Sequence, residues 1–514
     1  MASVSFKRTA AFVAAFGIAL APATAGLAIA TAQTNPAPAY NSIDWTQNGQ
    51  ASLTVVKKLL GAGENPGDPA TGETIGTTPG TLLEGVTFQL QQVTNVDLST
   101  NEGWAAASKI ANGAADAVTP VLDEGITQTT GANGEAVFSG LQFGLYLVTE
   151  TVVPEGVVPS APFYVFVPMT SLASDGTPTT AWNYNPVVYP KNTSSTATKE
   201  VVDADDNVGD SITYTIKSDI PAVATNATTI TKYIVQDDLD EEQLTTTPGQ
   251  ITVGLSDGTV FAQGTDYTVT VNAATQQVEI VFTAAGLQKL TDAKTANSAV
   301  QVVTTIEADV KEIGGTDGIV KNQAIVITNN GSGGGDTTTT TNEVETKWGK
   351  VTINKKNEAG ETLAGAEFQL YRCEPGADGG SVLIGGPLTV GTGVTEPNTF
   401  VTNAQGTFTI DGLHVTNLEN HDDAINKFYC LVETKAPAGY AKLVEPIRFQ
   451  LHPGAPGVTD VTGANIVYTA DVLNVDDDDF LPETGGMGVG LIIAAGAGII
   501  GAGAYAARRN SAKS

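Results

Sequence analysis

Short runs of alternating apolar and polar residues cover most of the chain, and they predict β-strands. Threonine and valine recur in these runs, as in ASLTVVKK (51–58) and GKVTINKK (349–356). Glycine, with 56 residues, separates the runs where turns are expected. Long apolar periods of the helical kind are rare. The pattern therefore predicts an all-β chain of several domains, in which each strand buries one face.

Three sequence blocks occur twice in the same order, which predicts one fold used twice. ASLTVVKK and GKVTINKK open the two copies. The blocks that follow are LLEGVTFQL (82–90) and TLAGAEFQL (362–370), then YLVTETVVPEG (146–156) and YCLVETKAPAG (429–439).

Changes in composition divide the chain into three segments. A chain of 514 residues is long enough for about three domains of ordinary size, in keeping with this division. The segments run from 33 to 192, from 193 to 328 and from 346 to 479. Between the last two, NNGSGGGDTTTTTNEVE (329–345) has the Gly and Thr bias of a linker. A surface loop within one domain is the alternative.

Strand parity directs a lysine and a glutamate toward the core of each copy. Side chains at every second position share a face. Lys57 and Glu150 fall on the apolar faces of their strands, whereas Lys58 points away. The second copy repeats this arrangement with Lys355 and Glu433 inward and Lys356 outward.

A lysine and a glutamate buried together can act chemically. A salt bridge is the simpler alternative, but a buried ion pair returns little stability. Apolar surroundings lower the pKa of the lysine and raise the pKa of the glutamate. A neutral amine is a nucleophile, and a protonated glutamate can polarise a neighbouring carboxamide and shuttle protons. Exchange at an asparagine would release ammonia and leave a lysine to asparagine isopeptide bond.

The repeated blocks resemble the CnaB-type domains of Gram-positive pilins, whose glutamate lies in an "E box" similar to YxLxETxAPxGY. Residues 429–440 fit this box nearly throughout, while the earlier copy ends in Val157 instead of tyrosine. The resemblance implies an acceptor asparagine on the last strand. In the third segment this is Asn474, 41 residues after Glu433.

Three asparagines could serve the first segment, namely Asn183, Asn185 and Asn192. Only Asn192, 42 residues after Glu150, matches the spacing in the third segment. We therefore expect Asn192 to accept Lys57, with a hydrogen-bonded turn residue as the alternative.

The middle segment resembles the CnaA-type relative, in which the acid comes from a different strand and is usually aspartate. The resemblance implies Lys199 as the amine, Asp237 as the acid and Asn322 as the acceptor. Asp238 and Lys321 lie close enough in sequence to leave the assignment open.

WNYNPVVYPKN (182–192) resembles the pilin motif WxxxVxVYPKN of sortase-assembled shaft pilins. The family's lysine is Lys191, whose amine resolves the sortase acyl-enzyme at Thr484 of another subunit. Pro186 replaces the usual valine, and because proline cannot donate in a sheet ladder, we expect the strand to bend or begin there. Parity places Lys191 outward and Asn192 inward.

The amino-terminal end carries an export signal. Lys7 and Arg8 precede an apolar stretch, and Ala30-Thr31-Ala32 offers a small-residue cleavage site. Residues 1–32 are therefore predicted to be a secretory signal peptide, with an uncleaved membrane anchor as the alternative.

The carboxyl-terminal end carries a second signal in three parts. FLPETGG (480–486) precedes an apolar run from Met487 to Ala507 and then a basic tail. This order resembles the cell-wall sorting signal of Gram-positive surface proteins, in which a sortase cysteine attacks the threonine carbonyl and releases everything from the glycine onward. The motif residues are Leu481, Pro482, Glu483, Thr484 and Gly485.

Composition argues against several other functions. A net charge of −30 argues against nucleic acid as a partner. Because the chain is predicted to be exported, Cys373 and Cys430 are expected to form a disulfide. The two cysteines and three histidines do not have the spacing of zinc ligands, which argues against a zinc site. DADDNVGD (203–210) misses the EF-hand glycine position, and the acidic run 476–479 is predicted to be a solvated tether. We expect no metal, no cofactor and no catalytic triad for an external substrate.

Together the motifs resemble those of a major pilin, and the resemblance implies three crosslinked immunoglobulin-like β-sandwich domains of CnaB, CnaA-like and CnaB type. It implies head-to-tail polymerisation by a class C sortase, with minor tip and base pilins, and attachment to peptidoglycan by a housekeeping sortase. The subunit would support adhesion outside the cell, with a host receptor as a further partner and a membrane span only before sortase cleavage. The alternative is a monomeric wall-anchored adhesin.

Overall fold

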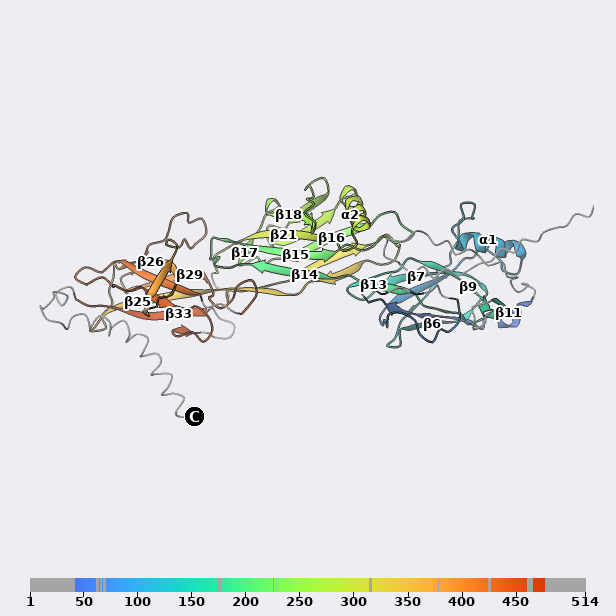
Figure 1. Cartoon of the computed structure of the whole chain (residues 1–514), viewed down its shortest axis with the longest axis horizontal. Coiled ribbons are helices and arrows are strands. Elements are labelled where there is room, and N and C mark those ends of the chain that lie inside the picture. The colour runs from blue at the N-terminus through green and yellow to red at the C-terminus, as the bar shows by residue number, and fades with distance from the viewer. Residues whose placement is uncertain are drawn as a thin grey trace, which may run out of the picture.

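Three β-domains lie end to end along the long axis of the molecule (Figure 1). The computed structural model describes residues 42–476, apart from 62–63, 65–66, 68–70, 173–177, 225, 314–316, 378, 424–426 and 460–465. The predicted signal peptide, sorting motif and apolar carboxyl-terminal run lie outside these residues. Over the part of the chain that is described, no helix has the length and hydrophobicity needed to cross a membrane.

The first domain is built from three main sheets, ordered β12-β1-β6, β5-β4-β7-β9 and β3-β2-β13-β8, with a β10–β11 hairpin. Alternation along β1 and β4 places Leu53, Val55, Phe88 and Leu90 in one core. The elements are β1 (Ala51–Val56), β2 (Lys58–Leu59), β3 (Thr81–Leu82), β4 (Thr87–Gln92), α1 (Asn101–Ala111), β5 (Ile126–Thr129), β6 (Glu135–Leu141), β7 (Gly144–Val152), β8 (Val157–Val158), β9 (Phe163–Val167), β10 (Met169–Leu172), β11 (Pro178–Asn183), β12 (Val187–Val188) and β13 (Lys191–Ser194).

The middle domain packs a sheet ordered β14-β15-β21-β17, with β18 also on β21, against one ordered β19-β20-β16-β23-β24. Strictly alternating burial along β15 buries Ile212, Tyr214 and Ile216 between them. The elements are β14 (Ala197–Val202), β15 (Ser211–Asp219), β16 (Lys232–Asp238), β17 (Leu244–Thr245), β18 (Ile251–Leu255), β19 (Tyr267–Val271), β20 (Gln277–Phe282), α2 (Ala284–Ala296), β21 (Gln301–Val310), β23 (Ala324–Asn329) and β24 (Thr337–Thr340).

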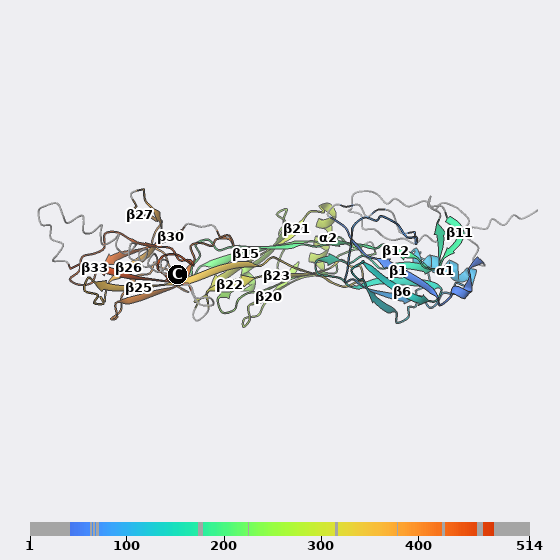
Figure 2. The same cartoon turned by 90° about the horizontal axis from the view of Figure 1, so that it is seen from below.

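The third domain shares a strand with the middle one. The first residues of β25 (Val344–Asn357) pair with β22 (Ile319–Asn322), and its later residues pair with β29 and β33. Figure 2 shows β25 running from the middle domain into the third. The remaining elements are β26 (Glu367–Pro375), β27 (Ser381–Ile384), β28 (Phe400–Val401), β29 (Thr407–His414), β30 (Phe428–Lys435), β31 (Ile447–Phe449), β32 (Val458–Thr459) and β33 (Ile466–Asn474).

The expected linker 329–345 is largely part of the fold. Its threonine run forms β24, which pairs antiparallel with β23, and its end begins β25. Thr337 and Thr339 are buried while Thr338 and Thr340 are exposed. Alternating β-branched residues suit an edge strand, so the composition that suggested a tether forms part of a sheet instead.

The acidic segment 203–210 lies between the middle and third domains. The Asp203 carboxylate faces the His414 ring, with 3.2 Å between Oδ2 and Nε2. Asn207 Oδ1 accepts from the Tyr429 hydroxyl at 2.9 Å and from the His414 backbone amide at 3.0 Å. Asp205 pairs with Lys427 at 2.7 Å. This segment therefore joins two domains through its polar side chains.

Candidate crosslinking sites

Parallel strand pairs bring the predicted lysines and asparagines together in the first and third domains. In the first, Leu59 on β2 is paired with Asn192 on β13. In the third, Asn357 on β25 is paired with Asn474 on β33. In each case the lysine precedes the paired residue by two positions and shares its face. The two copies therefore have the same register between their first and last strands.

The first-domain cluster is fully enclosed. Lys57 and Asn192 have no exposed surface, and Glu150 has 2%. Lys57 Nζ donates to Glu150 Oε1 and, at 2.6 Å, to Asn192 Oδ1. Asn192 Nδ2 donates to Glu150 Oε2 at 2.8 Å. The amine and the acid thus flank one carboxamide, as amide exchange requires.

The third-domain cluster repeats this arrangement. Lys355 Nζ contacts Asn474 Oδ1 and lies 3.3 Å from Glu433 Oε1. Asn474 Nδ2 donates to both oxygens of Glu433, at 3.3 and 3.2 Å. All three side chains are buried, so the predicted inward orientation of this lysine and glutamate is confirmed.

Burial favours the neutral amine in both clusters. Loss of solvation lowers the pKa of Lys57, although Glu150 opposes the shift. The same cause lowers the pKa of Lys355 to about 8, against the opposing charge of Glu433. A lysine with a depressed pKa is available as a nucleophile near neutral pH.

The middle cluster is assembled from different strands. Lys199 on β14 pairs with Asp237 Oδ2 on β16, and both side chains are inaccessible to solvent. Asn322, at the end of β22, is 3% exposed and lies beside Asp237. Burial lowers the pKa of Lys199 and raises the pKa of Asp237. These shifts move the pair toward a neutral amine and a protonated acid.

Of the residues that had left the middle assignment open, Asp238 and Lys321 lie apart from the cluster. Asp238 is exposed at the end of β16. Lys321 is exposed and pairs with Glu343 at 3.0 Å. The geometry therefore favours Asp237 and Asn322 beside Lys199.

Lys191 lies on the opposite face of β13 from Asn192, directly across from Lys58 on β2. The prediction that Lys191 points away from the core is confirmed. Its side chain is nevertheless half-buried, and Nζ donates to the Tyr189 carbonyl at 3.0 Å. Burial, followed by the charge of Lys58, lowers the pKa of Lys191. The strand begins directly after Pro186, as expected, but it is divided into β12 and β13 at Tyr189 and Pro190.

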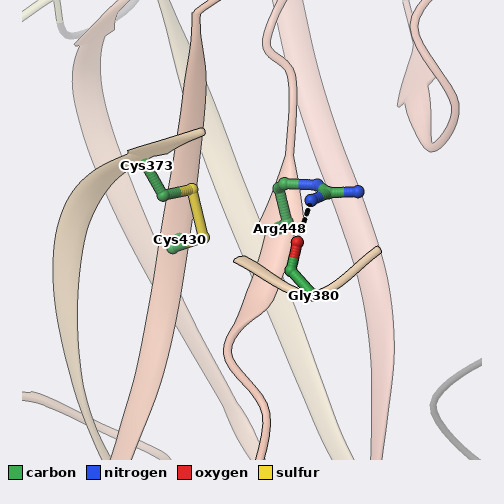
Figure 3. The surroundings of a disulfide bond; sticks show 4 residues. All are labelled: Cys373, Gly380, Cys430 and Arg448. Atoms are coloured by element: carbon green, nitrogen blue, oxygen red, sulfur yellow. Dashed lines mark hydrogen bonds between the residues drawn. A yellow bond between two sulfur atoms is a disulfide. The ribbon is translucent and has the colours of Figure 1, made fainter. Parts of the chain in front are cut away.

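The predicted disulfide between Cys373 and Cys430 is confirmed, with a Cα–Cα distance of 5.8 Å. It joins the neighbouring strands β26 and β30 beside the E box (Figure 3). Close by, Arg448 on β31 donates to the Gly380 carbonyl at 2.6 Å, at the turn between β26 and β27. Both contacts hold the protruding β26–β27 hairpin to its sheet.

Sequence reasoning missed a backbone amide that supports each glutamate. The Ser160 amide lies 3.4 Å from Glu150 Oε2, and the Ser160 hydroxyl donates to Oε1 at 2.6 Å. The Leu443 amide donates to Glu433 Oε2 at 2.7 Å. Each amide follows its acid by ten residues, and this shared spacing is the signal that could have revealed it.

Comparisons with known proteins give the family. The chain is 31% identical over 504 residues to the fimbrial subunit type 2 of Actinomyces naeslundii, covering 90% of this chain and 89% of that protein. The chain belongs to the Gram-positive fimbrial subunit family. Residues 48–193 match the family model of the N-terminal domain (D1) of Gram-positive pilin subunits, and residues 349–465 match that of a prealbumin-like fold domain.

Solved fimbrial structures have the same architecture. The full-length major pilin SpaD from Corynebacterium diphtheriae is 37% identical, with a TM-score of 0.62 over 85% of this chain and 99% of that one. The major pilin SpaA from the same species is 27% identical, with a TM-score of 0.58 over 83% of this chain and 100% of that one. The resemblance to major pilins and the tandem all-β fold are thus confirmed. This fimbrial subunit is a structural protein of an extracellular pilus shaft.

Proposed function

We propose that this fimbrial subunit builds a shaft that is covalent both within and between subunits. Within a subunit, the bonds join Lys57 to Asn192, Lys199 to Asn322 and Lys355 to Asn474. The observation that carries the proposal is the repeated register, which places each lysine of the outer domains two residues before the partner of its asparagine.

Each internal bond forms by amide exchange. The neutral lysine Nζ attacks the asparagine Cγ, and the acid receives a proton from Nζ and gives one to Nδ2. The Cγ–Nδ2 bond breaks and ammonia leaves, so the acid ends in its starting state. Glu150, Asp237 and Glu433 take this role. The chemistry acts once, on the protein itself.

The internal bonds carry tension along the shaft. In the outer domains each bond links the first strand to the last strand, and these two strands lie side by side and run parallel. A pulling force then passes through the crosslink instead of shearing the sheet. The loop closed by Lys57 and Asn192 spans 135 residues, and chain entropy alone gives about 5 kcal/mol for a loop of this size.

Between subunits, the bond joins Lys191 to Thr484 of another copy. A class C pilin sortase forms an acyl-enzyme at Thr484, and the Lys191 amine resolves it. Minor tip and base pilins complete the pilus, and a housekeeping sortase attaches it to peptidoglycan. The mature subunit then runs from residue 33 to Thr484, with β24 (Thr337–Thr340) as part of its middle domain. Residues 1–32 and everything after Thr484 are removed.

The decisive test of polymerisation is a cell-wall extract from cells whose only pilin carries Lys191→Ala. We expect the high-molecular-weight ladder to disappear while folded monomer is still secreted. Lys58→Ala is the matched control, because Lys58 lies opposite Lys191 on the neighbouring strand and should leave a ladder. A ladder that persists in Lys191→Ala cells would exclude this lysine, and a wild-type strain without a ladder would favour the monomeric adhesin.

The internal bonds have a separate test in the intact mass of the secreted chain. The mass should fall short of the sequence mass by three ammonia molecules, in addition to the two hydrogens lost to the disulfide. A full sequence mass after allowance for the disulfide would contradict all three bonds.

A further inference from the structure

Buried polar atoms without a hydrogen bond gather in the middle crosslinking site. Within the described residues, Asp237 Oδ1, both polar atoms of the Asn322 side chain and the Tyr214 hydroxyl lack a partner at ordinary hydrogen-bonding geometry. Buried polar groups in native proteins are nearly always paired, so such a cluster requires an explanation.

Tyr214 stands at the centre of this cluster. It lies on β15, where it pairs with Val201 of β14, while Lys199 pairs with Ile216. Tyr214 is therefore the diagonal neighbour of Lys199 on the inward face. Lys199 Nζ lies 4.5 Å from the centroid of the Tyr214 ring. Asp237 and Asn322 both lie close enough to the Tyr214 hydroxyl to affect its pKa.

The outer domains place a different residue over the lysine. Phe88 lies 5.8 Å from Lys57 Nζ, and Phe368 lies 5.7 Å from Lys355 Nζ. A phenylalanine ring has no polar atom to offer. In those domains, however, both oxygens of the acid accept hydrogen bonds. The middle acid has one unpaired oxygen, and its aromatic neighbour carries a hydroxyl.

We propose that Tyr214 is a further catalytic residue of the middle crosslink, whose hydroxyl donates a hydrogen bond to Asn322 Oδ1 as the amide exchange proceeds. The inference rests on the proposed Lys199–Asn322 bond. As Lys199 Nζ attacks Cγ, negative charge develops on Oδ1, and a donor fixed at that point stabilises the tetrahedral intermediate. Asp237 receives a proton from Nζ and gives one to Nδ2, the Cγ–Nδ2 bond breaks, and ammonia leaves.

The phenol keeps its own proton throughout. Burial is the main cause that raises the pKa of Tyr214, and the Asp237 carboxyl raises it further. Tyr214 therefore acts as a hydrogen-bond donor, not as an acid. Its ring also packs against the attacking amine.

The test follows formation of the Lys199–Asn322 bond in the mature chain, residues 33 to 484. This chain is made by cell-free synthesis and sampled over time. Proteolysis and mass spectrometry quantify the branched peptide that contains Lys199 and Asn322. For Tyr214→Phe we expect this branch to form at least about tenfold more slowly, since losing one oxyanion donor typically costs more than this. The branches at Asn192 and Asn474 should form at the wild-type rate in the same molecules.

Tyr233→Phe is the matched control. Tyr233 is another buried tyrosine of the middle domain, and its hydroxyl lies 2.7 Å from Ser218 Oγ. This variant should form the middle branch at the wild-type rate. Tyr214→Phe removes an unpaired buried hydroxyl, a change that does not destabilise the fold by breaking a hydrogen bond. Thermal unfolding of both variants checks that the fold is retained.

Two results would overturn the proposal, and they are distinguishable. If wild type and Tyr214→Phe form the middle branch equally fast, Tyr214 has no catalytic role although the crosslink stands. If the wild-type chain never forms the branch, the proposed Lys199–Asn322 bond falls and the role of Tyr214 falls with it.

Discussion

Replacing Glu433 with glutamine should prevent the crosslink of the third domain while keeping the shape of the side chain. A carboxamide cannot shuttle protons between Lys355 Nζ and Asn474 Nδ2. The loop between these two residues spans 119 positions. Chain entropy gives about 5 kcal/mol for closing it, which corresponds to roughly 15–25 °C in the melting temperature of a domain of this size.

The assay combines intact mass with differential scanning calorimetry of the oxidised protein. Glu433→Gln should gain the mass of one ammonia relative to wild type, after correction for the substitution, and one transition should move down by the predicted amount. Glu367→Gln is the control, because Glu367 lies on the paired strand and its carboxylate makes a surface salt bridge to Lys435, at 2.8 Å. Such a bridge contributes about 0–1 kcal/mol. An unchanged mass deficit in Glu433→Gln would refute the reasoning.

Three further predictions concern the third domain and its junction with the middle domain. In Asn474→Ala, Lys355 stays unreacted, and its pKa is about 8 in the folded state but 10.5 in the unfolded state. The unfolded state therefore binds more protons between these pH values, so stability rises with pH. Urea unfolding should show a gain of about 1 kcal/mol from pH 7 to pH 9. Replacing both cysteines with serine should lower the unfolding free energy by about 2–4 kcal/mol, up to the chain-entropy value for a 57-residue loop, as measured in guanidinium. Asn207→Ala leaves the buried His414 amide without its acceptor, so the urea midpoint should fall by the equivalent of about 1–3 kcal/mol, whereas Asn354→Ala at an exposed hydrogen bond should have little effect. Flat stability with pH, unchanged guanidinium unfolding or equal urea midpoints would contradict these predictions in turn.

The inward-facing residues of the outer domains could be predicted because a strand has a fixed period of two. Once Leu53 and Val55 are assigned to the core, the burial of Lys57 follows. The spacing from Glu150 to Asn192 singled out the asparagine that lies beside Lys57, because both copies connect the acid strand to the last strand in the same order. Parity, however, describes only direction, so it did not reveal that Lys191 is half-buried against the Tyr189 carbonyl.

Other features depend on contacts between distant parts of the chain. The junction between Asn207 and Tyr429 joins residues 222 positions apart, and no local pattern indicates such a partner. The low complexity of its threonine run predicts a linker at β24, but the β-branched side chains also suit a sheet edge, and the segment pairs with β23. The unpaired hydroxyl of Tyr214 likewise depends on how two sheets pack, which no local pattern along the chain encodes.

The most direct test of a covalent shaft is the mass spectrum of peptides from purified pili. Pili of the wild-type strain, digested with a protease, should yield a branched peptide in which Lys191 Nζ is joined to the carboxyl group of Thr484. The amine of Lys58 should be free in the same digest. Pili in which Lys191 is unmodified, or in which Thr484 is joined to a different lysine, would contradict this account of how the subunits are connected.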